Sequence, residues 1–273
     1  VYQTVAPKVK AATQEIVTLL QVVEPTTIKG QKQQAIVRLL LKLGERPVKE
    51  VLSLAKANRT SLQGLVKKGI ISLTVKPVIR RPDLTFPSQQ TAVKLTAEQL
   101  KVINALQPFV GNKYGFFLLE GVTGSGKTEV YLELAKKALT QGKTALFLVP
   151  EVALISQLAA RLNERFPEQV CVYHSYLSAG ERYDAWWQVF KGERKIVIGT
   201  RSALFLPFQE LALVVVDEEH ETSYKQNQSP RYHARTVAQR LAQLTNAVLV
   251  LGSATPAIET KYKAEKKGHS FKL

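Results

Sequence analysis

Residues 116–128 read Phe-Phe-Leu-Leu-Glu-Gly-Val-Thr-Gly-Ser-Gly-Lys-Thr. The apolar run at their start is typical of a buried parallel strand. The residues after it match the pattern G-x-x-x-x-G-K-T, which predicts a phosphate-binding loop that leads into a helix. Glycines let such a loop aim successive backbone N–H groups at a phosphate, and the helix adds the positive end of its dipole.

This loop predicts a site for ATP with Mg²⁺. The Lys127 ammonium is expected on the β- and γ-phosphates, and the Thr128 hydroxyl on the magnesium ion. The other loop residues expected to bind nucleotide are Gly121, Thr123, Gly124, Ser125 and Gly126. A glycine-rich turn can match the pattern by chance, but here strand, loop and helix follow in the required order.

Apolar strands and amphipathic helices alternate from residue 116 onward. We expect strands at 116–120, 144–149, 170–174, 195–200, 211–216 and 247–252, and helices at 127–140, 153–166, 179–190 and 234–244. This alternation predicts an α/β domain with a mostly parallel sheet, whose active residues lie at the carboxyl ends of the strands.

Two such strand ends carry chemistry that fits a phosphate loop. Asp217 directly follows strand 211–216, where a carboxylate is expected to hold Mg²⁺, and Glu218 would orient and activate the attacking water. An acidic helix cap is the alternative. The last strand is followed by Ser253 and Thr255, whose hydroxyls can bond to the acidic motif Asp217-Glu218-Glu219-His220, unless they form an ordinary small-residue turn.

Gln99 has two possible roles. Together with Thr96 it matches a capping box at the start of a helix. It also lies just upstream of the phosphate loop, where its amide offers the donor and acceptor that an adenine edge requires. The cap alone would explain the residue.

The chain before the phosphate loop has a different organisation. Helical periodicity between residues 31 and 69, followed by short strands at 70–75 and 78–80, gives the order of a winged-helix domain. The expected division is 1–29 connector, 30–81 winged helix, 82–94 linker and 95–273 phosphate-loop domain. Arg59 and Lys67 lie on the polar side of the third helix and could face DNA, although winged helices also bind proteins.

Charge favours a nucleic-acid partner. The 273 residues carry a formal net charge of +16. Residues 1–95 hold 16 Lys and Arg against 5 Asp and Glu, an excess of +11, whereas residues 96–273 hold 22 against 17, an excess of +5. A solvated basic surface is the alternative, but an excess this concentrated is typical of DNA-binding segments.

The cysteine count and the lack of long apolar runs in the sequence indicate the cellular environment that we expect for the protein. With a single cysteine, Cys171, the chain has no disulfide framework and no cysteine zinc site of its own. No apolar run approaches the length of a membrane span, and no signal peptide opens the sequence, so we expect a cytoplasmic protein. The start at Val1 suggests a fragment of a longer protein.

Three short motifs, taken together, resemble a known family. Gly-Ser-Gly-Lys-Thr, Asp-Glu-Glu-His and Ser-Ala-Thr, in this order, resemble motifs I, II and III of superfamily 2 helicases. The finer pattern is similar to the PriA family of bacterial primosomal replication-restart helicases, on residues 121–131, 148–151, 199–205, 223–226 and 231–235.

The resemblance implies a RecA-like first helicase lobe in an ATP-dependent 3′ to 5′ DNA helicase that acts at stalled forks. It implies ATP and Mg²⁺ as cofactors, with zinc in a part of the full-length protein outside this chain. The implied partners are DNA forks, single-stranded DNA, replication-restart proteins and single-stranded-DNA-binding protein. It also implies a second lobe with an arginine finger, without which this chain alone is expected to be inactive.

The same resemblance implies DNA contacts. The residues it assigns to DNA are Arg201, Tyr224, Lys225, Arg231, Tyr232 and Arg235. Aromatic side chains there can stack on bases without sequence preference, which suits a motor. The alternatives are a surface ion pair for Arg201 and inward packing for the aromatics.

Two other functions remain open. One is an ATP-driven DNA translocase that does not separate strands. The other is a DNA-binding module whose nucleotide site acts only as a switch.

Overall fold

The computed structural model of the protein describes residues 12–78 and 94–273. They belong to two units, a smaller one that ends near residue 80 and a larger one that follows it. The two are described separately. Most of the expected 82–94 linker lies outside the described residues.

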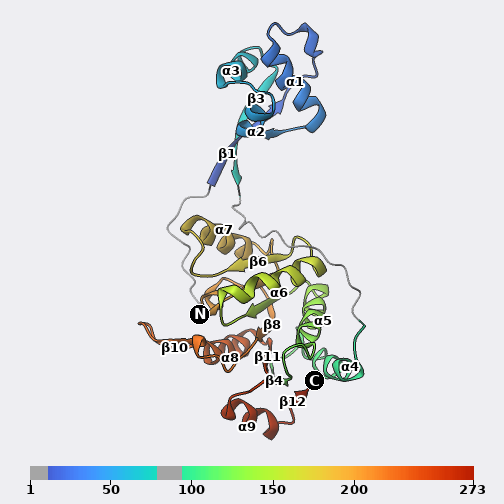
Figure 1. Ribbon diagram of the computed structural model, residues 1–273, viewed down its shortest axis with the longest axis vertical. Coiled ribbons are helices and arrows are strands. Elements are labelled where there is room, and N and C mark those ends of the chain that lie inside the picture. Colours follow the sequence, from blue (N-terminus) through green and yellow to red (C-terminus); the bar gives the residue numbers. More distant parts are fainter. Residues whose placement is uncertain (1–11, 79–93) are drawn as a thin grey trace. The chain divides into compact units, whose positions relative to one another are not determined.

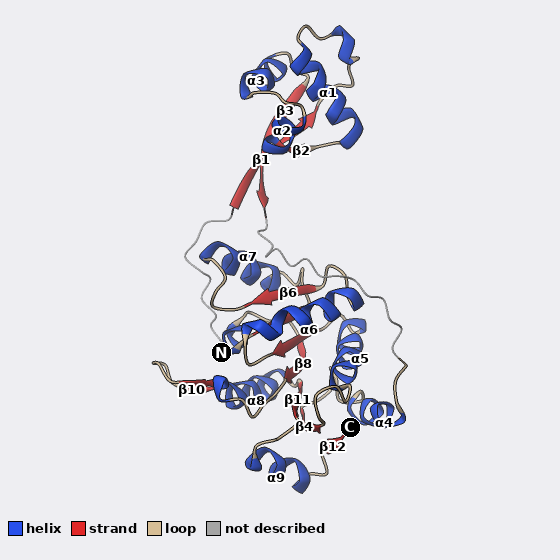
Figure 2. Cartoon of the chain, viewed as in Figure 1, coloured by secondary structure: helices blue, strands red, loops and turns tan. Residues whose placement is uncertain are grey.

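The smaller unit packs its helices on an antiparallel sheet (Figure 2). Its elements are β1 (Ala12–Leu19), a 3₁₀ turn (Pro25–Thr27), α1 (Gln31–Leu43), β2 (Arg46–Pro47), α2 (Val48–Leu54), α3 (Arg59–Lys67) and β3 (Ile71–Val78). The strand order is β2-β1-β3, and both pairings are antiparallel. Fully buried Val17, Ile36 and Leu62 join the sheet to α1 and α3. The Asn58 side chain caps α3 by accepting a hydrogen bond from the Ser61 amide.

Two expectations about this unit are wrong. Residues 12–19 are not part of a connector, because β1 pairs with β3 along its whole length, from Ala12 opposite Val78 to Leu19 opposite Ile71. The short strands expected at 70–75 and 78–80, which would form a hairpin with its turn at Lys76 and Pro77, are instead one continuous strand through Val78. Its partner comes from the start of the chain. Residues 1–11 of the expected connector and residues 79–81 of the expected winged helix lie outside the described residues.

The larger unit is an α/β domain with a parallel sheet (Figure 1). The sheet strands are β4 (Gly115–Glu120), β5 (Thr144–Leu148), β6 (Val170–Tyr173), β7 (Ile196–Gly199), β8 (Leu211–Val216), β11 (Val248–Ser253) and β12 (Ser270–Lys272). Their order is β12-β4-β11-β8-β5-β7-β6, and every pairing is parallel. The predicted fold class is therefore confirmed for this unit.

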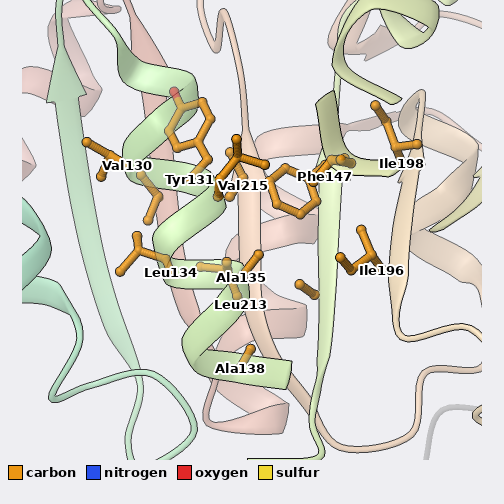
Figure 3. Packing of buried hydrophobic residues seen from close by; sticks show 14 of the residues in the cluster. Val130, Tyr131, Leu134, Ala135, Ala138, Phe147, Ile196, Ile198, Leu213 and Val215 are labelled. Carbon is orange, nitrogen blue, oxygen red and sulfur yellow. The ribbon is translucent and has the colours of Figure 1, made fainter. Parts of the chain in front are cut away.

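Helices bury both faces of this sheet. They are α4 (Ala97–Leu106), α5 (Lys127–Thr140), α6 (Val152–Arg165), α7 (Ala179–Phe190), α8 (Ala234–Thr245) and α9 (Ile258–Lys266). Along β4, Phe117 and Leu119 pack with α4, α5 and α6, as part of the core shown in Figure 3. Phe116 and Leu118 belong to the opposite core with α7, α8 and α9. Alternate residues thus face opposite layers, which explains why the strand is apolar throughout.

The strand order determines where the site forms. β11 lies between β4 and β8, so the loops that follow these three strands meet at one edge of the sheet. In the sequence the same loops begin at Gly121, Asp217 and Ala254, far from one another. No helix within residues 12–78 or 94–273 is long and apolar enough to cross a membrane.

Candidate nucleotide-binding site

The phosphate loop connects β4 to α5, as the sequence predicts. Gly124 and Gly126 take positive φ angles of 87° and 89°, which side chains strongly disfavour. α5 then begins at Lys127, whose side chain is 7% exposed. The Lys127 ammonium donates to the Gly121 carbonyl oxygen over 2.6 Å and lies 3.5 Å from a carboxylate oxygen of Glu218. This charge is therefore held inside the loop, next to the acidic motif.

The acidic motif begins at the end of β8. Burial raises the pKa of the Asp217 carboxyl, and the negative charge of Glu218 raises it further. A hydrogen bond from the Tyr131 hydroxyl to Asp217 Oδ1, 3.0 Å long, and the charge of Lys127 oppose that shift. Glu218 has a φ of 45°, an unusual angle for a residue with a side chain. Such angles are concentrated at functional sites, where the surrounding structure enforces them.

The loop after β11 joins the other two. The Gly121 amide donates to the Ser253 carbonyl (3.1 Å), and the Glu219 amide donates to the Gly252 carbonyl (2.9 Å). The Ser253 hydroxyl lies within hydrogen-bonding distance of His220 Nδ1, at 2.7 Å, and accepts from the Thr255 amide. The predicted bond between Ser253 and the acidic motif is confirmed, whereas Thr255 takes part through its backbone.

These loops line a cavity of about 640 Å³. The predicted residues that face it are Thr123, Gly124, Gly126, Lys127, Thr128, Asp217, Glu218, His220 and Thr255. A hydroxyl and a carboxylate, from Thr128 and Asp217, fit the preference of Mg²⁺ for oxygen ligands, with few protein carboxylates and the rest supplied by phosphates and water. The cavity therefore has the donor set that a magnesium nucleotide requires.

Part of the cavity wall could not be foreseen from motifs. Leu154, Gln157 and Arg161 come from α6 and face the same space. Arg161 also lies 3.8 Å from Glu129 of α5. Their helical spacing marked them only as one side of an amphipathic helix.

The capping role that the sequence predicts for Gln99 is confirmed. Thr96 and Gln99 form a complete capping box at the start of α4. The Gln99 amide nitrogen also donates to the Gly126 carbonyl over 3.3 Å, and the side chain is buried. α4 is thereby tied to the phosphate loop. An adenine contact by Gln99 stays a prediction.

A buried ion pair lies behind the acidic motif. The Glu219 carboxylate is fully buried and forms a short bond with Arg235. It also accepts hydrogen bonds from the Ala257 amide (2.8 Å) and the Thr260 hydroxyl (3.2 Å), where α9 begins. Arg235 in turn donates to Thr260. Arg235 therefore compensates a buried carboxylate through Nη1, while its side chain stays 25% exposed, so the predicted DNA contact stays a prediction.

The loop that follows the acidic motif is anchored to the sheet. Tyr224 is 1% exposed, so the prediction that it stacks on DNA bases is wrong for this structure. Its hydroxyl donates to the carbonyl oxygens of Asp217 (2.7 Å) and Leu148 (3.1 Å). The Arg201 guanidinium donates to the Ser223 and Lys225 carbonyls, each over 2.8 Å. Arg201 therefore holds this loop, and any phosphate contact would be additional.

The other predicted DNA residues remain accessible. Lys225 and Arg231 are exposed. Lys225 begins the short strand β9 (Lys225–Gln226), and Arg231 directly precedes its antiparallel partner β10 (Tyr232–His233). Tyr232 is partly buried and meets Phe205 edge-on, with ring centroids 5.3 Å apart. In the smaller unit, Arg59 and Lys67 are exposed on α3, and Arg59 Nη2 donates to both carboxylate oxygens of Glu15.

The family of the chain follows from its sequence match. Residues 86–263 match the DEAD/DEAH box helicase family, which is well over half of the chain. The chain belongs to this family. The phosphate loop, acidic motif and Ser-Ala-Thr loop described above are thus parts of a helicase lobe.

Within that family, the chain is similar to curated replication restart proteins. The chain is 41% identical over 247 residues to "Replication restart protein PriA" of Synechocystis sp., with 90% of this chain and 30% of the relative covered. It is 40% identical over 244 residues to the protein of the same name from Bacillus subtilis, with 87% and 30% covered. The chain thus spans about a third of the length of these relatives.

A solved structure shows the same lobe architecture. In "Structure of RecG bound to three-way DNA junction", 67% of this chain superposes on 24% of that chain, with a TM-score of 0.50 and 21% sequence identity. At that identity the likeness concerns the fold alone.

Proposed function

We propose that the full-length protein is an ATP-dependent DNA helicase that acts at stalled or abandoned replication forks, in replication restart and primosome assembly. One observation carries this proposal. Lys127, Asp217 and Glu218 converge on one cavity, in a chain that is 41% and 40% identical to two replication restart proteins. The 3′ to 5′ direction, and partners among restart and single-stranded-DNA-binding proteins, rest on the family resemblance.

Each residue of the cavity would have a separate role in ATP hydrolysis. Mg²⁺ would neutralise charge on the β- and γ-phosphates, held by Thr128 and Asp217. Lys127 would exchange its bond to Gly121 for the phosphates. Glu218 would orient the attacking water and take its proton. His220 and Ser253 would relay changes at the γ-phosphate to the loop after β11, because they already lie 2.7 Å apart.

DNA contacts are proposed on both units. Lys225, Arg231 and Tyr232 are candidates for the single strand in the helicase lobe, since base stacking and phosphate pairing need accessible side chains. In the smaller unit, the three helices and antiparallel sheet support a winged-helix assignment, with α3 facing duplex DNA.

Two assays on the full-length protein test the proposed function. DNA-stimulated ATP hydrolysis is expected, and its absence would leave only the switch-like binding module. Strand displacement on a fork substrate is also expected. Hydrolysis without displacement would instead assign the protein to translocases that do not separate strands.

Replacing Arg59 and Lys67 together with alanine should weaken duplex or fork binding. Each lost phosphate contact reduces the slope of log K against log salt by about 1, so the double variant is expected to reduce it by about 2. Fluorescence anisotropy over a salt series measures the slope. Because Arg59 is bound to Glu15, Glu15→Ala should leave the slope unchanged or steepen it.

A matched control uses Lys32 and Lys42, two exposed lysines of α1 in the same unit. Their replacement with alanine removes the same charge from another helix. An equal loss of slope in this control would mean that the unit attracts DNA by net charge and does not dock through α3.

A further inference from the structure

Tyr131 brings a buried hydroxyl to the acidic motif. The residue lies one helical turn after Lys127 in α5, and its side chain is 0% exposed. Figure 3 shows the ring packed within the apolar cluster, with its oxygen at the edge of that cluster. There the hydroxyl donates a 3.0 Å hydrogen bond to Asp217 Oδ1.

Packing alone does not require this hydroxyl. Phenylalanine fills nearly the same volume, and a buried hydroxyl costs free energy unless it is hydrogen-bonded. The surrounding backbone also leaves room for the oxygen. A Cβ atom on Gly252 would lie 1.7 Å from the Tyr131 oxygen and 3.0 Å from Asp217 Oδ1. The glycine before Ser253 thus leaves open the space in which phenol and carboxylate meet.

The backbone of Asp217 is fixed independently. Its amide donates to the Leu148 carbonyl over 2.9 Å. Its carbonyl accepts the hydrogen bond from Tyr224 described above. With the main chain held on both sides, the freedom that remains is rotation of the carboxylate. The Tyr131 bond restrains that rotation, because it holds one of the two carboxylate oxygens.

We propose that Tyr131 is a positioning residue for magnesium. By holding Oδ1, it keeps the Asp217 carboxylate turned so that the other oxygen is presented to the Mg²⁺ of bound ATP. This inference rests on the proposed nucleotide site. Hydrogen-bond partners that orient metal-binding carboxylates typically change metal affinity about 10- to 100-fold when they are removed.

Tyr131→Phe in the full-length protein tests the proposal. Binding of a non-hydrolysable fluorescent ATP analogue is titrated with Mg²⁺ in the absence of DNA. The magnesium concentration at half-saturation is expected to rise about 10- to 100-fold. At saturating Mg²⁺ the analogue should bind as it does to the wild type, because Lys127 and the loop are untouched.

Tyr224→Phe is the matched control. It removes an equally buried hydroxyl that bonds to the same aspartate, but to its backbone carbonyl. Its magnesium dependence should shift clearly less than that of Tyr131→Phe, because the bond from the Asp217 amide to Leu148 still holds the backbone. Gly252→Ala supplies a second perturbation of the same contact, since the added methyl group occupies the position of the Tyr131 oxygen. It should shift the magnesium dependence in the same direction as Tyr131→Phe.

The outcomes separate this inference from the function on which it rests. If the wild type does not bind the analogue at all, the proposed nucleotide site fails, and this inference fails with it. If it binds the analogue without any need for Mg²⁺, the nucleotide site stands, but the magnesium role of Asp217 fails and so does the positioning role of Tyr131. If the wild type depends on Mg²⁺ but Tyr131→Phe has the same dependence, only the positioning role is overturned. Equal shifts in Tyr131→Phe and Tyr224→Phe would also overturn it, because general loosening of the site would explain both.

Discussion

Glu218→Gln, made in the full-length protein, is expected to lower the rate of ATP hydrolysis about 10²- to 10⁴-fold, the usual contribution of a general base. The amide keeps the size of the side chain but cannot take a proton from water. ATP binding should persist, because Lys127, Thr128 and Asp217 are all retained. Single-turnover hydrolysis and fluorescent nucleotide titration measure the two effects separately.

Lys127→Ala is the comparison variant for Glu218→Gln, because it should impair nucleotide binding as well as hydrolysis. This variant removes the buried ammonium that lies between the Gly121 carbonyl and Glu218. Both binding and hydrolysis should fall, because a charge-assisted contact to the β- and γ-phosphates is lost. Near-normal turnover in Glu218→Gln would remove Glu218 from the role of base. If the glutamine variant instead loses nucleotide binding as Lys127→Ala does, Glu218 serves the binding step.

The core of the helicase lobe was predictable because its signals are local. Runs such as Leu211–Val216 are long, apolar and bounded by turns, so both their type and their limits could be read from sequence. α9 was missed, since Ile258–Lys266 is rich in charge and presents little apolar surface to the sheet. β12 was missed too, because three residues at a sheet edge give no periodic signal.

Pairing between distant segments was the main source of error. β1 has no regular alternation of polar and apolar residues, and its partner β3 lies more than fifty residues away. The sequence therefore favoured a local hairpin around Lys76, where a turn-forming proline is present. Sheet register depends on such distant partners, and propensity alone does not reveal them.

Motifs identified the chemical residues of the site but not their supports. Lys127, Asp217 and Ser253 belong to short patterns with known chemistry, so their convergence could be expected. The Tyr131 hydroxyl reaches a carboxylate 86 residues away. Tyr131 is the last residue of the segment 121–131 that carries the family resemblance, but the sequence assigned no chemistry to it. Its place on the buried side of the helix that begins at the phosphate loop gave no sign of its partner. Tyr224 was wrongly predicted to be exposed and to stack on bases. It is an aromatic residue in a polar loop, and such a sequence gives no sign that the ring is buried.

Arg235 gives the second large effect, this time on stability. Glu219 is fully buried, and its carboxylate is compensated by Arg235, Thr260 and the Ala257 amide. Removing one partner of a buried ion pair typically costs about 3–5 kcal/mol, because the other charge is left uncompensated. Arg235→Ala is therefore expected to destabilise the helicase lobe by about that amount.

Urea unfolding of the 273-residue chain, followed by tryptophan fluorescence, measures this effect. Both tryptophans, Trp186 and Trp187, lie in α7, so the signal reports the larger unit. Arg240→Ala is the matched control on α8, because Arg240 is exposed and its contact with Gln243 is long, at 3.5 Å. A surface change of this kind is expected to stay within about 0.5 kcal/mol.

The double variant Arg235→Ala with Glu219→Gln distinguishes a lost ion pair from lost packing. If the cost of Arg235→Ala comes from an uncompensated charge, neutralising Glu219 should recover part of it, and the double-mutant cycle should show coupling. Additive losses would mean that the guanidinium acts through its packing. A DNA-contacting arginine, as the sequence had suggested, predicts a third result. Arg235→Ala would then match Arg240→Ala in urea without DNA, and its defect would appear only when DNA is added.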